Sequence, residues 1–439
     1  MRILRAIGIV AAVLVLGIAV VWYLTLGDAH APPPTNFGAS PVLPAPRAQT
    51  IPTMNVNSTA PWPADKTPVA PKGFTVTRFA ADLKHPRWLY VLPNGDVLVA
   101  EAAPPLAEIS SVSTAVEHWL DEKNGSAPPS ANDIVLLRDT DGDGKPDVRT
   151  VFLKGLNQPF GMLLLNGWFY VADTDAVLRF PYKDGETSID AKGEKIMTLP
   201  VGHHWTRNIV AGEDGKKIFV SVGSGSNIAD NGIASEKGRA DILEANPDGT
   251  DKQIYASGLR NPNGMGWEPA THVLWVAVNE RDMLGDDLVP DYMTGVKPGA
   301  FYGWPWSYWG QHVDERVQPQ DPAMVAKAIA PDYALGAHTA SIGLVFYTAA
   351  AFPARYRGGV FIGQHGSWNR SGFTGYQVVY VPFRNGKPAG KPEDFLTGFM
   401  ADPRTGVAYG RPVGVTVDKS GALLVADDVG NIVWRVSAK

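Results

Sequence analysis

The stretch "GRPVGVTVDKSGALLVADD" at residues 410–428 combines two apolar runs with a tight polar connection. An arginine and a proline precede the first run, "DKSG" separates the runs, and Asp427 and Asp428 close the second. Asp, Ser and Gly between two short apolar runs are typical of a β-hairpin turn. The stretch therefore predicts two neighbouring antiparallel strands with polar residues at their ends.

The same pattern recurs along the chain. The other units are "HPRWLYVLPNGDVLVAEA" (85–102), "NQPFGMLLLNGWFYVADT" (157–174), "HWTRNIVAGEDGKKIFVSVGS" (204–224), "RNPNGMGWEPATHVLWVAVNE" (260–280) and "ASIGLVFYTAAAFPARYRGGVFIGQH" (340–365). Six such units, with further strands between them, predict an all-β, six-bladed β-propeller over residues 73–439. A pair of β-sandwiches is the alternative, but it does not explain the equal pattern of the units. We expect no long amphipathic helix in this domain.

The N-terminus carries a segment of a different kind. Arg2 and Arg5 precede residues 7–26, which are apolar and uncharged. About 20 such residues span a ~30 Å hydrocarbon core, and the preceding arginines favour a cytoplasmic N-terminus. Residues 29–31, Ala-His-Ala, resemble a signal-peptidase site, so a cleaved signal peptide is the alternative to an anchor. Both interpretations place the domain in the periplasm.

The predicted order of segments follows from these patterns. Residues 1–31 are a signal anchor or a signal peptide, residues 32–72 form a Pro-rich linker, and residues 73–439 form the propeller domain. The DEKNGSAPPSAND stretch at 121–133 is expected to be a solvated insertion.

The overall composition excludes several classes of protein. A net charge of −5 offers no basic surface for nucleic acid. The chain has no cysteine, which rules out disulfides, thiolate metal sites and lipobox acylation. The 46 glycines and 36 prolines agree with a fold rich in turns.

Polar side chains stand at both ends of the hairpins in every unit. In a propeller, these ends and the loops between blades converge on one face around the central channel. A single such residue is ordinarily a cap, but a ring of cations and amides around one histidine suits an anionic ligand. The residues before the first strands are His85, Arg87, Gln158, His204, Arg207, Arg260, Asn261 and Arg411. Those after the second strands are Glu101, Asp173, Ser224, Asn279, Glu280, Gln364, His365, Asp427 and Asp428.

Several of these motifs, in this order, resemble one enzyme family. They are "GHHWTRNI", "GLRNPNGMGWEP", "VNERDMLGDDLVPDY" with "YGWPWSYWG", "GQHGSWNRSGFTGYQVV", and "GRPVGV" with "LLVADD". The chain is similar over about residues 73–437 to the pyrroloquinoline-quinone (PQQ)-dependent glucose/sorbosone dehydrogenases, and most similar to their L-sorbosone dehydrogenase branch. The resemblance implies an exported six-bladed propeller that holds PQQ and Ca²⁺.

The resemblance also implies roles for individual residues. His204 takes the place of the general base that accepts the sugar hydroxyl proton, a role suited to a neutral imidazole. Arg260 and Asn261 match a cofactor-contacting pair, Gln158 matches a cofactor-site glutamine, and Arg411 matches an arginine that pairs with a cofactor carboxylate. His203 has no matching role and is expected to shape the loop.

The same resemblance predicts where the cofactor calcium binds, and at two positions the chain differs from the family pattern. Main-chain carbonyls of Glu280 and Arg281 match the loop that ligates the calcium. Ser224 stands where the glucose-oxidising relatives have an aspartate that orients the base, so the orienting group or the substrate must differ. The family lysine near the cofactor has no clear counterpart, and His365 or Arg370 is a candidate replacement.

Two further signals remain outside this scheme. Asp139, Asp141, Asp143 and Asp147 have the spacing of a calcium loop, but no glutamate follows at the twelfth position, and a plain acidic turn is the alternative. Trp304, Trp306 and Trp309 suggest sugar stacking, although packing in the core or at the rim is the simpler interpretation.

Three functions agree with these features. The first is a quinone-dependent dehydrogenase that oxidises an aldose or sorbosone-like sugar at C1 and passes electrons to a membrane quinone or a cytochrome. The second is a calcium-dependent propeller hydrolase or lactonase that uses Asn279, Glu280 and Asp427. The third is a non-catalytic propeller that binds a partner or a glycan. Arginines directed at the central channel favour the first, because a tricarboxylate cofactor needs them and a hydrolase does not.

Overall fold

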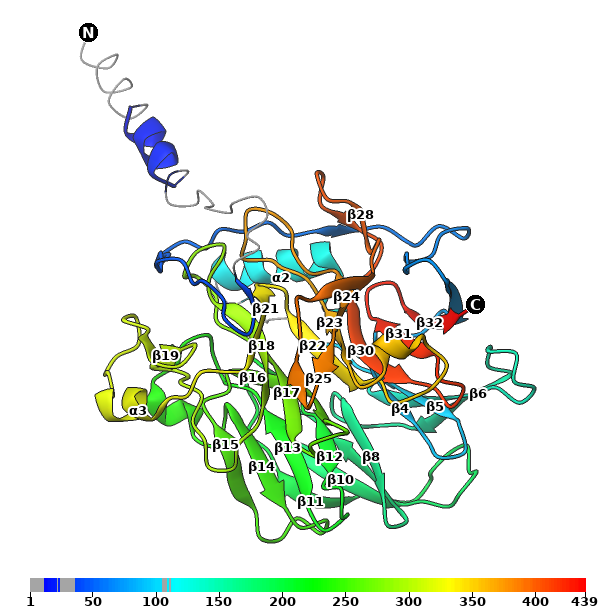
Figure 1. Cartoon of the computed structure of the whole chain (residues 1–439). Helices are drawn as coiled ribbons and strands as arrows, with labels where there is room; N and C mark the ends of the chain where they lie inside the picture. The colour runs from blue at the N-terminus through cyan, green and yellow to red at the C-terminus, as the bar shows by residue number, and fades with distance from the viewer. Residues whose placement is uncertain (1–11, 22, 24–35, 105–108, 110–111) are drawn as a thin grey trace.

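A computed structural model of the chain describes residues 12–21, 23, 36–104, 109 and 112–439 (Figure 1). Residues 12–21 are helical. Within the described part of the chain, no helix combines the length and the apolar character needed to cross a membrane. The predicted anchor at 7–26 is only partly inside the described residues, and the predicted cleavage site at 29–31 is outside them.

Six antiparallel sheets form the body of the described chain. The first three contain β4 (Pro86–Val91), β5 (Val97–Glu101), β6 (Asp133–Arg138) and β7 (Val148–Leu153); β8 (Gly161–Leu165), β9 (Trp168–Ala172), β10 (Ala176–Pro181) and β11 (Glu194–Thr198); and β12 (Ile209–Ala211), β13 (Ile218–Val222), β14 (Asp241–Ala245) and β15 (Gln253–Ser257). The other three contain β16 (Asn261–Trp267), β17 (Leu274–Asn279), β18 (Pro290–Gly295) and β21 (Tyr333–Ala337); β22 (Ser341–Phe346), β23 (Val360–Gln364), β24 (Gln377–Val381) and β27 (Glu393–Leu396); and β30 (Pro412–Val417), β31 (Leu423–Asp427), β32 (Ile432–Ala438) and β3 (Phe74–Ala80).

The described part of the chain also contains shorter strands and helices. The short strands are β1 (Phe37–Gly38), β2 (Ser58–Thr59), β19 (Ser307–Tyr308), β20 (His312–Val313), β25 (Phe383–Arg384), β26 (Lys387–Pro388), β28 (Met400–Asp402) and β29 (Val407–Ala408). The helices are α2 (Val112–Asn124), α3 (Pro322–Lys327) and the 3₁₀ turns η1 (Ile233–Glu236) and η2 (Ala354–Tyr356).

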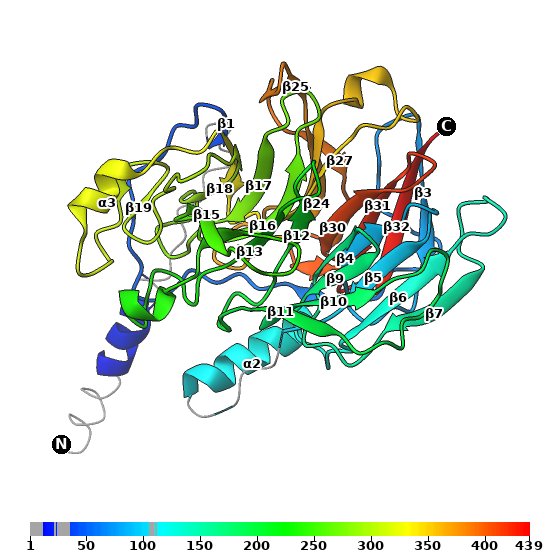
Figure 2. The ribbon, with the colours of Figure 1, turned by 90° about the horizontal axis from the view of Figure 1, so that it is seen from below.

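The six sheets form a closed, propeller-like ring. Each innermost strand contacts the innermost strand of the next sheet, in the order β4, β8, β12, β16, β22, β30 and back to β4. The ring closes in the last sheet, where β3 from the start of the domain pairs with the C-terminal strand β32 (Figure 2). The second strands, such as β5, β13 and β31, are buried along their whole length because other sheets cover both of their faces. This explains why they appear in the sequence as continuous apolar runs.

Glycines in the innermost strands allow neighbouring sheets to approach closely. A Cβ on Gly161 would lie 2.6 Å from the Ile209 backbone nitrogen, and one on Gly264 would lie 2.6 Å from the Ile342 carbonyl oxygen. A Cβ on Gly414 would lie 2.7 Å from the Arg87 carbonyl oxygen. The glycine of "QPFG", "NPNG" and "RPVG" therefore has the same role in three sheets: it lets one backbone pass against the next.

The predicted all-β, propeller-like fold is confirmed, with two differences. The domain contains α2, a helix of 13 residues, between β5 and β6. The sequence pattern missed this helix because its Trp119 is 57% exposed rather than part of a buried stripe. In addition, the described part of the expected linker, residues 36–72, lies along the domain. There β1 pairs with β21, β2 pairs with β29, and Trp62 packs against Trp434 with ring centroids 4.9 Å apart.

The glycine contacts predict a specific stability effect. Gly161→Ala should lower the free energy of unfolding by about 2 kcal/mol, because the new methyl group meets backbone that cannot rotate away. Urea unfolding followed by tryptophan fluorescence measures this. Gly212→Ala is the control, since its Cβ would have no neighbour closer than 3.4 Å. Equal stability of the two variants would contradict the close-approach argument.

Candidate active site

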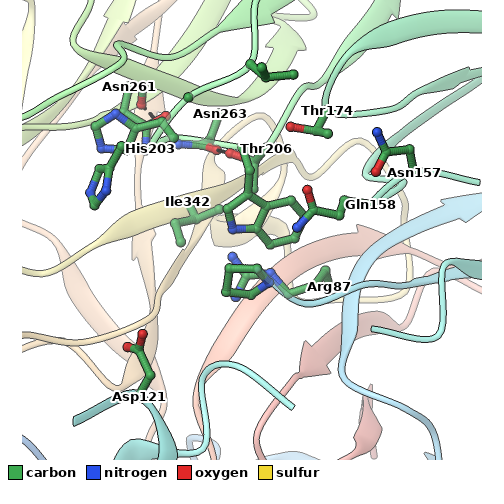
Figure 3. A pocket seen from close by; sticks show the side chains of 15 residues that line it. Arg87, Asp121, Asn157, Gln158, Thr174, His203, Thr206, Asn261, Asn263 and Ile342 are labelled. Carbon is green, nitrogen blue, oxygen red and sulfur yellow. Dashed lines mark hydrogen bonds between the residues drawn. The ribbon is translucent and has the colours of Figure 1, made fainter. Parts of the chain in front are cut away.

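A cavity of about 600 Å³ lies where the leading ends of several inner strands meet. Figure 3 shows its lining, with Arg87 and Gln158 on one side and His203 and Asn261 on the other. Asp121, from α2, stands apart from the other labelled side chains in this view. The lining residues are Arg87, Pro104, Asp121, Asn157, Gln158, Thr174, Val201, Gly202, His203, His204, Trp205, Thr206, Asn261, Asn263 and Ile342. Four residues singled out from the sequence, Arg87, Gln158, His204 and Asn261, thus line one cavity.

His204 lies in the loop before β12, and its imidazole is held in one orientation. Its Nδ1 is 2.9 Å from the Ser224 carbonyl oxygen and 2.9 Å from Ser224 Oγ. A carbonyl oxygen only accepts hydrogen bonds, so Nδ1 must carry the proton. Nε2 then has the lone pair and is free to accept a proton from a ligand in the cavity.

The surroundings of His204 keep its imidazole neutral. Burial, the Arg260 guanidinium and the neighbouring His203 together hold the pKa of His204 well below its ordinary value of 6.5, although the hydrogen bond to Ser224 opposes them. Arg207 Nη1 donates to the His204 carbonyl oxygen at 2.7 Å and fixes the backbone of the loop. A neutral, fixed imidazole is the form that a general base requires.

Two polar atoms of residues that line the cavity have no partner in the described chain. They are Asn261 Oδ1 and Arg87 Nε, and both atoms are buried. Asn261 lies near His204: a Cβ on Gly223 would overlap Asn261 Oδ1 and would also be 2.7 Å from His204 Cβ. The Arg87 guanidinium lies over the Trp205 ring at 5.3 Å. Buried polar atoms are rarely left unpaired, so both residues are suited to a polar ligand.

Arg260 is placed differently from the prediction. It is 2% exposed and is not among the residues that line the cavity. Its guanidinium donates to Glu280 O at 2.6 Å and to Asn227 Oδ1 at 2.9 Å, and it pairs with Asp282 at 3.4 Å. The residue therefore supports the wall next to His204 and holds the loop after β17.

Arg411 and His365 belong to a buried cluster around Asp428. The Asp428 carboxylate accepts hydrogen bonds from Arg87 Nη1 and from His365 Nε2, the latter at 2.8 Å. Burial opposes the charge, yet His365, His85 and Arg87 hold the pKa of Asp428 well below its usual range. Arg411 donates to the His365 carbonyl oxygen at 2.8 Å. Arg87 connects this cluster to the cavity, while Arg411 and His365 lie behind the lining.

The histidines of this cluster are neutral at pH 7 and become charged only in the acidic range in which Asp428 itself would be protonated. Burial and nearby arginines lower the pKa of His365 to about 3, although Asp428 opposes them. Burial likewise lowers the pKa of His85 to about 4. The negative charge of Asp428 is thus balanced mainly by Arg87.

The predicted calcium loop and Arg370 have structural partners. Arg281 is fully buried and donates to Pro305 O and Ser307 O, each at 2.7 Å. Arg370 pairs with Asp287 at 2.9 Å. Glu280, Arg281 and Arg370 are not among the residues that line the cavity.

Carboxylates at the ends of the second strands hold the leading loops of the first strands. Asp173 Oδ2 accepts from the Asn157 backbone at 2.9 Å, and Asp427 Oδ1 accepts from the Arg411 backbone at 2.8 Å. Burial raises the pKa of Asp173 to about 7 and that of Asp427 to about 6. Asp173 and Asp427 thus fix loops that precede first strands, and neither residue is among those that line the cavity.

The acidic loop after β6 brings three of its four predicted aspartates together. Ligand atoms of Asp139, Asp141 and Asp147 lie within 4.8 Å of one another. Thr140 donates to Asp147, which lowers the pKa of that carboxylate. Asp143 instead accepts from the Lys145 backbone at 2.8 Å. This group lies in a loop between outer strands, away from the residues that line the cavity.

A family model described as "Domain of unknown function (DUF7133)" matches residues 66–367. The chain belongs to this family. A second model, described as "TrAA12-like", matches residues 308–439 of the DUF7133 chain. An uncharacterised protein of Borreliella burgdorferi is 28% identical over 296 residues, which are 64% of this chain and 76% of that protein. An aldose sugar dehydrogenase of Escherichia coli is 28% identical over 130 residues, 28% of this chain and 33% of that enzyme.

Solved structures share the fold of the DUF7133 chain. The holo PQQ domain of a pyranose dehydrogenase from Coprinopsis cinerea has a TM-score of 0.69 at 18% identity, over 87% of this chain and all (100%) of that one. A calcium structure of a family AA12 enzyme from Trichoderma reesei scores 0.68 at 19% identity, over 85% and 97% of the two chains. The PQQ-bound aldose sugar dehydrogenase of Streptomyces coelicolor scores 0.56 at 16% identity, over 84% and 100%.

The buried cluster around Asp428 predicts that a single substitution strongly lowers the stability of the fold. Asp428→Asn should lower the free energy of unfolding by about 3 kcal/mol, because it leaves the buried Arg87 guanidinium without a counter-charge. Denaturant unfolding measures this. Asp402→Asn, which breaks an exposed pair with Arg404, is the control and should remain near wild type. If Asp428→Asn unfolded at the same denaturant concentration as the wild type, the charge pair of Asp428 with Arg87 would not stabilise the fold.

Proposed function

We propose that the protein is a PQQ-dependent dehydrogenase that oxidises an aldose or sorbosone-like sugar at C1. The observation that carries this proposal is the fixed, neutral imidazole of His204 beside a cavity large enough for a tricyclic cofactor and a sugar. The fold shared with PQQ domains of sugar dehydrogenases supports it. In this proposal each of the six sheets is one blade.

The residues of the cavity fit the cofactor. PQQ carries three carboxylates and quinone oxygens, and Arg87 offers a cation whose Nε has no partner in the described chain. Gln158 and Asn261 supply amides at two other sides of the cavity. Arg260 and Arg411 add positive charge from behind the lining rather than by direct contact, since their donors already bind main-chain carbonyls.

His204 acts on the sugar. Its Nε2 accepts the proton of the C1 hydroxyl. Its Nδ1 keeps its own proton, which it donates in a hydrogen bond to the Ser224 oxygens. Bound in this cavity, PQQ would supply the two-electron oxidising power that the oxidation of C1 requires. Asn261, next to His204, is placed to hold the sugar or the cofactor at the correct distance from the base.

A cofactor calcium on the predicted loop does not fit the described arrangement. The Glu280 carbonyl oxygen already accepts a hydrogen bond from Arg260 Nη1 at 2.6 Å. A divalent cation at the same oxygen would lie next to the positive guanidinium, which is electrostatically unfavourable. The acidic loop of Asp139, Asp141 and Asp147 has the oxygen ligands that Ca²⁺ prefers, and we propose it as a structural calcium site.

The hydrolase alternative has less support. Asn279 donates to Asp291 at 3.1 Å, and Asp427 Oδ2 accepts from the Trp62 indole at 2.7 Å. Neither residue is among those that line the cavity, so they are not placed to hold a metal-bound water there.

Export and electron transfer remain proposals from the sequence. We propose a periplasmic domain, tethered by residues 7–26 where they are not cleaved, that passes electrons to a membrane quinone or a cytochrome. Fractionation of cells that express the full chain tests the location, and a cytosolic protein would contradict it.

Cofactor addition tests the central proposal. The full chain with added PQQ should reduce an electron-accepting dye in the presence of one or more sugars from a panel of aldoses and sorbosone. His204→Gln should lower kcat by at least about 100-fold and retain PQQ binding, since loss of a general base costs ~10²–10⁴ in rate. Absence of turnover with every sugar, together with no binding of PQQ, would refute the proposal.

The low pKa of His204 predicts the pH profile. The base is active only when neutral, and its pKa in the folded protein lies below 6.5. The value of kcat/KM should therefore stay level as the pH falls through 6.5 and decline only at more acidic pH. A decline centred at or above pH 6.5 would contradict this assignment.

A further inference from the structure

The group that orients His204 carries no charge of its own, and its support comes from farther along the chain. Ser224 is fully buried, and its Oγ donates to the Ser226 carbonyl oxygen at 2.7 Å. Because that hydroxyl proton is used, Ser224 Oγ faces His204 Nδ1 with a lone pair, as the Ser224 carbonyl oxygen does. Both contacts therefore require a proton on Nδ1.

One buried carboxylate fixes the loop that carries these acceptors. Glu236, in η1, is 8% exposed, and its Oε1 accepts from Ser226 Oγ at 2.6 Å. Its Oε2 accepts from the Gly225 backbone nitrogen at 2.6 Å. Both oxygens of Glu236 thus bind the two residues that directly follow Ser224.

The neighbouring elements leave this loop little freedom. The Ser224 backbone nitrogen donates to Arg260 O at 2.8 Å, which joins the loop to the next sheet. Gly225 lies close to both side chains, since a Cβ at this position would be 3.2 Å from Glu236 Oε2 and 3.3 Å from Arg239 Cδ. Arg239 in turn donates to Val201 O, in the segment that leads to His204. Arg239 therefore lies between the segment that leads to His204 and the loop that carries its hydrogen-bond acceptors, and Glu236 holds the latter loop.

We propose that Glu236 is a positioning residue which, through Ser226 and Ser224, holds the His204 imidazole in the Nδ1-protonated tautomer. This inference deepens the proposed function and rests on it for the catalytic role of His204. Ser224 presents neutral oxygens to the imidazole. The Glu236 carboxylate does not contact the ring and is connected to it through Ser226 and Ser224, whose geometry it fixes. The base is oriented without a negative charge in contact with it.

Nitrogen NMR of the full chain labelled with ¹⁵N-histidine tests the tautomer directly. The signals of His204 are identified by comparison with His204→Gln. At pH 8 the wild type should show a protonated Nδ1 and an unprotonated Nε2. In Glu236→Ala the two shifts should move toward the average of the two tautomers. A protonated Nε2 in the wild type, or unchanged His204 shifts in Glu236→Ala, would overturn the proposal.

Kinetics and matched variants separate positioning from general stability. Glu236→Ala should lower kcat about tenfold with KM within about twofold, because a misplaced base slows the chemical step more than binding. Glu236→Gln keeps an acceptor for the Gly225 nitrogen and should restore part of the loss. Ser226→Ala removes the hydroxyl that donates to Glu236 and accepts from the Asp230 backbone nitrogen. This variant serves if Glu236→Ala does not fold, and it should reproduce the NMR change. Ser235→Ala, on the exposed side of η1, is the control and should match wild type in both measurements.

Two more results decide the matter. Ser224→Asp should raise the pH midpoint of His204, because a carboxylate then contacts the imidazole, and an unchanged midpoint would contradict the claim of a neutral orienting group. If the wild type neither binds PQQ nor oxidises sugar, the proposed function fails, but the tautomer spectra still test the role of Glu236 independently.

Discussion

The close approach of neighbouring inner strands is the constraint on which the rest of the structure depends. At Gly161, Gly264 and Gly414 the backbone of one sheet passes so near the next that a methyl group has no room. This approach brings the leading ends of the inner strands together around one space. The site follows from it, because His204, Gln158, Asn261 and Arg87 each lie at or just before such a strand end. A wider ring would separate these side chains.

The chemistry of the site depends on where the charged side chains lie relative to the cavity. Positive charge lies at Arg87 in the lining and at Arg260 and Arg411 behind it. Asp428, which pairs with Arg87, is buried, and Asp282, which pairs with Arg260, is half-buried. The cavity is therefore suited to an anionic cofactor and keeps His204 neutral. Ser224 completes this arrangement, since it orients the imidazole through neutral oxygens. Burial and the Arg260 guanidinium keep the pKa of His204 low, so its imidazole is neutral, the form that the proposed reaction requires.

The sequence was informative wherever a residue adjoins the repeated strand pattern. The pattern predicted the all-β fold, and Gln158, His204 and Asn261, which it singled out, line one cavity. It could not give the partners of Arg260 and Arg411, since position along a strand does not reveal which carbonyl a guanidinium reaches. Glu236 and Ser226 were missed because the connection between β13 and β14 has no repeat, and only the folded chain brings it to Ser224. The packing of residues 36–72 was missed for a similar reason: Pro-rich composition resembles a tether even when aromatic contacts such as Trp62 hold it in place.

The central claim is that one cavity, bounded by Arg87 and His204, receives an anionic redox cofactor. A crystal structure of the protein grown with PQQ tests it most directly. The account predicts a flat tricyclic density in this cavity, with an oxygen of the ligand at Arg87 Nε or within hydrogen-bonding distance of Asn261, and His204 Nε2 facing the remaining space. Density for the cofactor at another place on the protein, with this cavity filled only by water, would contradict it.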